Sequence, residues 1–152
     1  MGSRERVAAY LTSSGVPFEI REFGESTKNS GLAAQALGCT VAEIAKSVVF
    51  VNKVTVVVIL SGDKRVDVAR VSRVLGEEVR IAKPDEVKER TGFPIGGVPP
   101  FPHSEGVAVF PDSSLARFQD VWAAGGTPNV VFKIASRDLF RIVGRGPFEL
   151  SA

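Results

Sequence analysis

The sequence predicts an α/β fold of the α+β type: a mixed, mostly antiparallel sheet, or a partly closed barrel, covered by short helices. Three patterns indicate it. Apolar, β-branched runs of strand length recur along the chain. Short helical stretches lie between them, and several end at a glycine. Some runs follow one another across a tight turn and others across a helical stretch, so hairpins and crossovers share one sheet.

The N-terminal segment is predicted to be a helix followed by a strand. Ser3 is the expected N-cap, and Gly15 is the expected stop. Residues 16–20 alternate apolar and charged side chains, which is typical of a half-buried strand. Residues 24–30 are polar and are expected to form a turn.

Two more short helices are expected before the next strand. The first carries an apolar face and ends at Gly38. Thr40 and Glu43 then have the spacing of a capping box. This pattern predicts a second helix through about Lys46.

A β-hairpin is predicted in the middle of the chain. Residues 47–52 and 54–60 are rich in valine and isoleucine, and they are joined at Asn52-Lys53. The second run is apolar at nearly every position. We therefore expect it to be a central strand that is buried on both faces.

The next elements are a capped helix, a short strand and another helix. Asp67 is the expected N-cap of a helix that ends at Gly76. Residues 79–82 form the predicted strand. Pro84 suits the first turn of a helix that continues through Arg90.

The C-terminal third is predicted to supply three further strands and a last helix. The strands are expected at residues 107–110, 120–123 and 130–134, and Ser136 is the expected helix cap. No repeat, linker or low-complexity tract interrupts the 152 residues. We therefore expect one domain spanning residues 1–152, which is long enough to bury a substantial core.

Composition excludes several classes of protein. Apolar residues make up 44% of the chain and charged residues 24%, which is ordinary for a globular domain. The net charge of +2 permits a small cationic patch beside a phosphate backbone but does not by itself indicate nucleic acid. The single cysteine, Cys39, rules out an internal disulfide and a multi-cysteine zinc site. No apolar run is long enough to span a bilayer, so we expect a cytoplasmic protein.

An unusual loop runs from Thr91 to Pro102. Seven of its twelve residues are glycine or proline, so it cannot continue a helix or lie centrally in a sheet. It also carries four apolar side chains that need cover: Phe93, Ile95, Val98 and Phe101. The loop is either the wall of a pocket or a rigid connector that closes one end of the core.

Common catalytic motifs are missing. The chain has no phosphate-binding Gly-Lys-Ser loop, no paired histidine and carboxylate metal motif, and no serine nucleophile elbow. His103 is the only histidine, and it is either a direct participant or a surface or capping residue. We expect no metal site.

Lys46 stands out among the charged residues. It follows an apolar helical pattern and precedes the strand run Val48-Val49-Phe50-Val51, so core surrounds it. Lysine is seldom buried without a partner. It either extends to solvent, where it complements a helix C-terminus, or points as a cation into a cleft.

Taken together, the motifs resemble those of the YbaK and prolyl-tRNA synthetase editing-domain family. The matching pieces keep the family's order and cover almost the whole chain. They are Ala33-Ala34-x-x-Leu37-Gly38, Ile44-x-Lys46-Ser47-Val48-Val49-Phe50, Ser61-Gly62-Asp63-Lys64-Arg65-Val66-Asp67, Thr91-Gly92-Phe93, Gly96-Gly97-Val98-Pro99-Pro100, Asp112 and Ser136-x-Asp138-Leu139.

The resemblance implies a free-standing aminoacyl-tRNA deacylase that hydrolyses the ester of a mischarged transfer RNA. It implies catalytic roles for Lys46 and Gly97, and no cofactor. The implied substrate-binding residues are Phe23, Gly96, Val98, Pro99, Pro100, Gly125 and Gly126. The implied partners are aminoacyl-tRNA, of the proline-tRNA type, and an aminoacyl-tRNA synthetase. Two alternatives stay open: a non-catalytic module that binds the acceptor end of transfer RNA or a synthetase, and a hydrolase of small esters or nucleotides.

The chain departs from the family at two positions. Members that remove cysteine carry a serine and an aspartate where this sequence places Ala124 and Val131. The segment typical of alanine-removing members is not evident either. The identity of the amino acid that is removed is therefore open.

Overall fold

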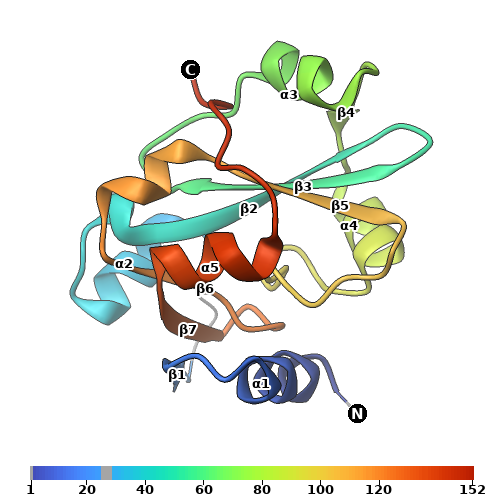
Figure 1. The fold of residues 1–152 in the computed structure, drawn as a ribbon. Coiled ribbons are helices and arrows are strands. Elements are labelled where there is room, and N and C mark those ends of the chain that lie inside the picture. Colours follow the sequence, from blue (N-terminus) through green and yellow to red (C-terminus); the bar gives the residue numbers. More distant parts are fainter. Residues whose placement is uncertain (1, 25–28) are drawn as a thin grey trace.

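The computed structural model describes residues 2–24 and 29–152, and the predicted turn over residues 24–30 lies mostly outside them. Within these residues the strands form a seven-stranded sheet in the order β1-β7-β6-β2-β3-β5, with β4 paired to β2 (Figure 1). The β2–β6 and β3–β5 pairs are parallel and the other pairs are antiparallel. The strands are β1 (Phe18–Glu22), β2 (Ile44–Val51), β3 (Thr55–Ser61), β4 (Arg80–Ile81), β5 (Val107–Pro111), β6 (Asp120–Ala124) and β7 (Val130–Ala135).

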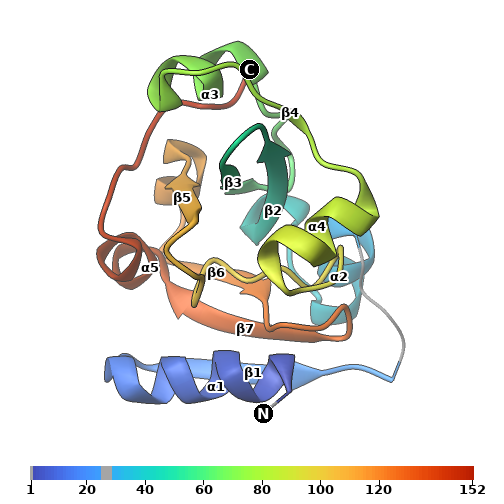
Figure 2. The same cartoon turned by 90° about the vertical axis from the view of Figure 1, so that its right-hand side faces the viewer.

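Short helices cover this sheet, which confirms the predicted fold class in its open-sheet form. Figure 2 shows α1 along the outside of β7 and α3 at the opposite side of the β2–β3 hairpin. The helices are α1 (Ser3–Ser14), α2 (Ser30–Leu37), α3 (Val68–Leu75), α4 (Pro84–Thr91) and α5 (Ser136–Val143), with 3-10 turns η1 (Val41–Glu43) and η2 (Ser113–Arg117). No helix among the described residues is long and apolar enough to cross a membrane.

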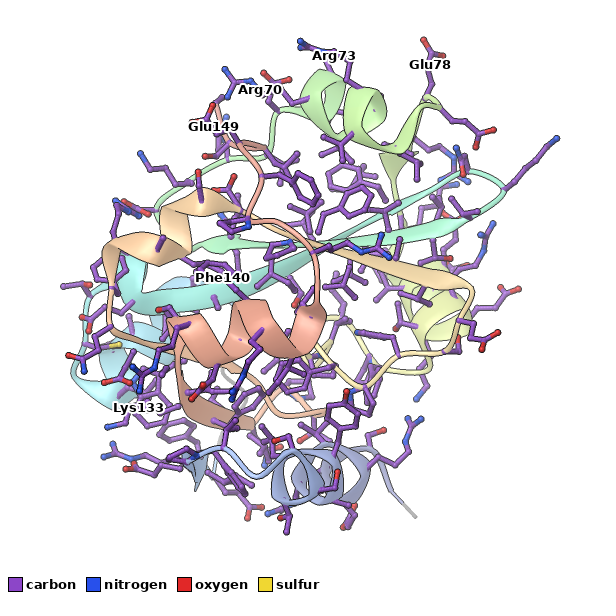
Figure 3. All side chains as sticks on the ribbon, viewed as in Figure 1. Arg70, Arg73, Glu78, Lys133, Phe140 and Glu149 are labelled. Carbon is purple, nitrogen blue, oxygen red and sulfur yellow. The ribbon has the colours of Figure 1, made fainter. Side chains whose placement is uncertain are left out.

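Strand β3 is the centre of the core, as its sequence predicts. Every one of its residues is buried. Because side chains alternate along a strand, Val57 and Ile59 join one apolar cluster and Val56 and Val58 join another. The first cluster also holds residues of α1, α4, α5 and the Gly/Pro loop, while the second contacts α3. Arg70 and Arg73 lie on the outer side of α3 (Figure 3).

The predicted helix from residue 40 to Lys46 is wrong. The capping interaction does form, since the Glu43 carboxylate accepts the Thr40 N–H at 3.0 Å, but the helical turn ends at Glu43. From Ile44 onward the chain pairs with β6 through Trp122 and with β3 through Ser61. Pairing with strands distant in sequence outweighs the local helix signal.

The helix stops at Gly15, Gly38 and Gly76 are confirmed, but two predicted caps are wrong. Gly2 and Ala135 occupy the N-cap positions where Ser3 and Ser136 were expected. The Ser136 hydroxyl instead donates to the Phe118 carbonyl, which ties α5 to the start of β6. β1 is also more exposed than expected, since Ile20 faces solvent on an edge strand.

The Gly/Pro loop packs into the core through three of its four apolar residues. Phe93, Val98 and Phe101 are buried, whereas Ile95 is 55% exposed. Gly97 lies against the backbone of the β6–β7 turn. A Cβ atom at Gly97 would come within 2.8 Å of the Thr127 Cα and 3.0 Å of the Gly126 carbonyl oxygen. Only glycine permits this close approach.

A buried carboxylate fastens the C-terminal segment to the sheet. Asp112 is fully buried, and its two carboxylate oxygens accept the N–H groups of Leu150 at 2.7 Å and Ser114 at 3.1 Å. Phe148 adds backbone bonds to Pro111 and Ser113. The aspartate that follows β5 is therefore a structural residue.

Replacing Asp112 with alanine is expected to lower the free energy of unfolding by about 3 kcal/mol, because two buried N–H groups lose a charged acceptor. Urea denaturation followed by circular dichroism measures it. Asp120→Ala is the matched control, since Asp120 is exposed and should change stability by less than about 0.5 kcal/mol. Equal stability of the two variants would contradict the structural role of Asp112.

Replacing Gly97 with alanine is expected to lower the free energy of unfolding by about 1–3 kcal/mol, because the added methyl group meets fixed backbone atoms. Gly106→Ala is the control, since a Cβ at Gly106 has open space and that glycine has no positive φ. The same denaturation curves compare the two. A Gly97→Ala protein as stable as Gly106→Ala would show that the loop does not pack tightly on the β6–β7 turn.

Candidate active site

A cavity of about 390 Å³ lies where β2, β6 and β7 meet α2, the turn after β3 and the Gly/Pro loop. Lys46 and Ser47 of β2 form one side, and Ile95, Gly96 and Val98 of the loop form another. Gly62 and the residues at the start of α2 border the remainder. The structure thus brings Lys46 and part of the Gly/Pro loop together.

Lys46 is half-buried on strand β2, not at the end of a helix, so a helix dipole does not explain its place. Its ammonium donates to the Gly62 carbonyl at 3.3 Å. Desolvation by burial lowers the pKa of Lys46, the nearby Asp63 carboxylate opposes that shift, and Arg65 adds to it. Of the two alternatives for this lysine, the structure favours a cation in the wall of a cleft.

The Gly/Pro loop is tied directly to the strand that carries Lys46. The Ser47 hydroxyl donates to the Val98 carbonyl at 2.7 Å. The Gly97 N–H donates to the Pro94 carbonyl at 2.9 Å, and Gly97 does not line the cavity. Among the described residues, the N–H groups of Gly96 and Val98 have no hydrogen-bond partner. Both residues line the cavity, so their N–H groups are candidates to bind a ligand, whereas the Gly97 N–H is already paired.

The opposite wall of the cavity is apolar. Ile44 pairs with Trp122 across β2 and β6, and Ala124 pairs with Val131 across β6 and β7. All four line the cavity, together with Ala33 of α2. The two positions at which the sequence departs from the family that it resembles therefore lie next to each other in the cavity wall. Neither offers a polar group to a ligand.

Trp122 is held in place by cations as well as by packing. The Arg21 guanidinium lies 5.2 Å from the indole ring centre, and the Lys133 ammonium lies 5.8 Å from it. Lys133 is labelled in Figure 3. Such contacts stabilise the orientation of a ring that lines the cavity.

Several residues expected to bind substrate lie behind the cavity wall. Pro99 and Pro100 are buried within the loop and do not line the cavity. Phe23 packs against the cluster that holds Trp122 and Val131, and its N–H donates to the Asn129 carbonyl at 2.8 Å.

Gly125 and Gly126 form the β6–β7 turn, where each approaches neighbouring backbone closely. A Cβ at Gly125 would lie 3.2 Å from the Val130 carbonyl oxygen, and one at Gly126 would lie 2.7 Å from that of Ser3. Neither glycine lines the cavity. These glycines shape the wall rather than form its surface.

His103 directly follows the Gly/Pro loop and does not line the cavity. Its Nε2 atom is 2.7 Å from the Pro99 carbonyl oxygen, and its ring meets Phe93 edge to face. Burial lowers the pKa of His103, the Pro99 bond opposes that effect, and Arg6 lowers it further. These contacts suit a residue that supports the loop as a neutral ring.

Sequence reasoning missed the polar rim of the cavity. Asn29 accepts the Leu32 N–H at 2.8 Å and caps α2, which places Asn29 and Ser30 at the rim. Gly62 also lies at the rim, and it packs closely on neighbouring backbone. A Cβ atom at Gly62 would lie 2.5 Å from the Val41 carbonyl oxygen. The N-cap spacing of Asn29 was the available signal.

The described residues that line the cavity offer a cation, backbone donors and hydroxyl groups, but no nucleophile with an adjacent base. Among the described residues no three histidine, cysteine, aspartate or glutamate side chains cluster in a way that could hold a metal ion. Such a site can hold an oxygen-rich group near Lys46 and a small apolar group against Ala124 and Val131. It can also polarise a carbonyl through Gly96 and Val98.

Known proteins resemble this chain over nearly its full length. The protein YwhH of Bacillus subtilis (strain 168) is 31% identical over 139 residues, which are 90% of this chain and 88% of YwhH. A solved structure of a proposed trans-editing enzyme for prolyl-tRNA synthetase is 36% identical with a TM-score of 0.90, covering 100% of this chain and 98% of that one. The structure of hypothetical protein APE2540 is 27% identical with a TM-score of 0.90, covering 97% and 99%.

These likenesses confirm the fold and the family resemblance carried by the motifs. A family model described as the aminoacyl-tRNA editing domain matches residues 24–142. The matched segment holds every cavity residue, from Asn29 to Val131. The chain belongs to the aminoacyl-tRNA editing domain family.

Proposed function

We propose that this protein hydrolyses, in trans, the ester bond of a mischarged aminoacyl-tRNA that carries a small, uncharged amino acid. One observation carries the proposal: Lys46 lines the same cavity as an apolar wall and as Gly96 and Val98, whose N–H groups have no partner among the described residues. An aminoacyl ester has both features that such a cavity accommodates. Its terminal nucleotide is rich in oxygen, and its side chain is small enough to lie against Ala124 and Val131.

The chemistry requires no protein nucleophile. The ester is already activated, so a positioned water can attack its carbonyl carbon and release the amino acid and the 3′-terminal hydroxyl of the RNA. Lys46 binds an oxygen of the terminal nucleotide. The Gly96 and Val98 N–H groups stabilise the negative charge that develops on the carbonyl oxygen. Gly97 contributes by holding the loop in position.

The apolar wall determines which amino acid fits. A charged side chain placed against Ala124 and Val131 would lose water without gaining a partner, which costs several kcal/mol. The cavity of about 390 Å³ must also hold part of the nucleotide, so a bulky side chain is excluded by size. The relative described as a trans-editing enzyme for prolyl-tRNA synthetase makes proline tRNA the first RNA to test, and that synthetase the first partner.

The proposal is tested by incubating the protein with proline tRNA charged with alanine, serine, cysteine, 2-aminobutyrate or proline. Alanine and 2-aminobutyrate esters should be cleared fastest. Lys46→Ala should lower kcat/KM about 100-fold, because a charged hydrogen bond to the terminal nucleotide, worth about 1.5–3 kcal/mol, is lost. Lys53→Ala is the matched control, because Lys53 is an exposed lysine at the hairpin tip.

Clearance no faster than in buffer, or a Lys46→Ala protein as active as the parent, would overturn the proposal. Binding of uncharged tRNA without turnover, weakening as salt is added, would instead identify a non-catalytic module. Turnover of small esters without the RNA body would indicate a general esterase.

The pH dependence of the reaction tests the charge on Lys46. Because burial lowers the pKa of Lys46 below its usual 10.5, the cation is lost at lower pH than for an exposed lysine. With buffer hydrolysis subtracted, kcat/KM should fall as pH rises through that lowered pKa. Lys46→Arg keeps its charge throughout this range, so it should remove the alkaline decline. An unchanged decline in this variant would assign it to another group.

A further inference from the structure

The turn after β3 forms the rim of the cavity beside Lys46. The Gly62 N–H donates to the Ile44 carbonyl at 2.8 Å, and the Gly62 carbonyl accepts from the Lys46 ammonium at 3.3 Å. The next residue is Asp63, whose carboxylate acts on Lys46 electrostatically. A movement of this turn would therefore change the surroundings of the lysine directly.

Arg117 holds Asp63 from the other side. Its guanidinium donates to both carboxylate oxygens, with Nη2–Oδ1 at 2.8 Å and Nη1–Oδ2 at 3.3 Å. Its Nε donates to the Ser114 carbonyl at 2.8 Å, and the guanidinium carbon lies 5.1 Å from the centre of the Phe118 ring. The contacts with Ser114 and Phe118 therefore orient the Arg117 side chain. Its bidentate contact in turn orients the Asp63 carboxylate.

Asp63 makes its ion pair with Arg117 and not with Lys46, although its carboxylate raises the pKa of Lys46. The other charged group that influences Lys46 is Arg65. Lys64 also acts on Asp63, more weakly than Arg117 does. If Arg117 were absent, the carboxylate would be left with Lys46 and Lys64 as neighbouring cations. A lysine paired with a carboxylate binds an anionic or ester oxygen less readily, since that oxygen must displace the carboxylate.

We infer that Arg117 is a positioning residue that holds the Asp63 carboxylate away from Lys46 and so keeps the lysine available to a ligand in the cavity. The nature of that ligand rests on the proposed function. The electrostatic relation between the three side chains does not. Arg117 acts through Asp63 and touches no substrate.

A double-mutant cycle with R117Q and D63N tests this inference. With mischarged tRNA as substrate, R117Q should raise KM about fivefold, the size of one partly exposed ion pair, with little change in kcat. D63N should lower KM more in the R117Q background than in the parent, because it removes the carboxylate that would occupy Lys46. R80Q is the matched control, since Arg80 makes an equally two-pronged contact with Glu86 outside the cavity.

A second readout needs no activity. In substrate-free protein labelled with [13C]lysine, the Lys46 resonance is assigned with K46R and titrated with pH. R117Q should raise the pKa of Lys46, whereas D63N should lower it with or without Arg117. R80Q should leave it unchanged.

The outcomes separate this inference from the proposed function. A Lys46 pKa that R117Q does not raise would overturn the inference, even in an active enzyme. A KM increase that D63N does not reverse would also overturn it, and would identify Arg117 as a direct contact to RNA. The expected pKa pattern in a protein with no deacylase activity would support the inference while the proposed function fails.

Discussion

The site depends on one hydrogen bond, from the Ser47 hydroxyl to the Val98 carbonyl at 2.7 Å. It joins residues 51 positions apart, and it connects the strand that carries Lys46 to the loop that carries Gly96. β2 is itself held by β3 on one side and β6 on the other, so its position is fixed by the sheet. The hydrogen bond fixes the Gly/Pro loop, which pairs with no strand, relative to β2. Together with the packing of Gly97 on the β6–β7 turn, it sets where Gly96 and Val98 lie relative to Lys46.

Local sequence signals predicted most of the fold, because helix stops and strand alternation act over a few residues. Gly15, Gly38 and Gly76 each end a helix, and β3 is buried on both faces. The start of β2 could not be predicted in this way. Its capping box favoured a helix, and the partners that make it a strand, Trp122 and Ser61, are distant in sequence.

Local patterns also could not predict the whole candidate site, because they do not reveal contacts between distant segments. Lys46, Gly96 and Val98 line one cavity, while Gly97 does not line it and packs against Thr127, thirty positions along the chain. A run of glycine and proline identifies a rigid loop but does not reveal which backbone groups face inward. The pairing of Arg117 with Asp63 likewise joins segments 54 residues apart, beyond the reach of any local pattern.

The central claim is that free backbone donors and Lys46 act on one ligand. The most direct measurement is a 15N–1H NMR titration with an aminoacyl-adenosine analogue in which an amide replaces the ester. The Gly96 and Val98 amide signals should shift downfield, and the side-chain ammonium signal of Lys46 should shift with them. The Gly97 amide signal should move little, because its N–H already donates to the Pro94 carbonyl. Unmoved Gly96 and Val98 signals, or shifts confined to another surface such as that around Phe118 and Phe140, would contradict the account.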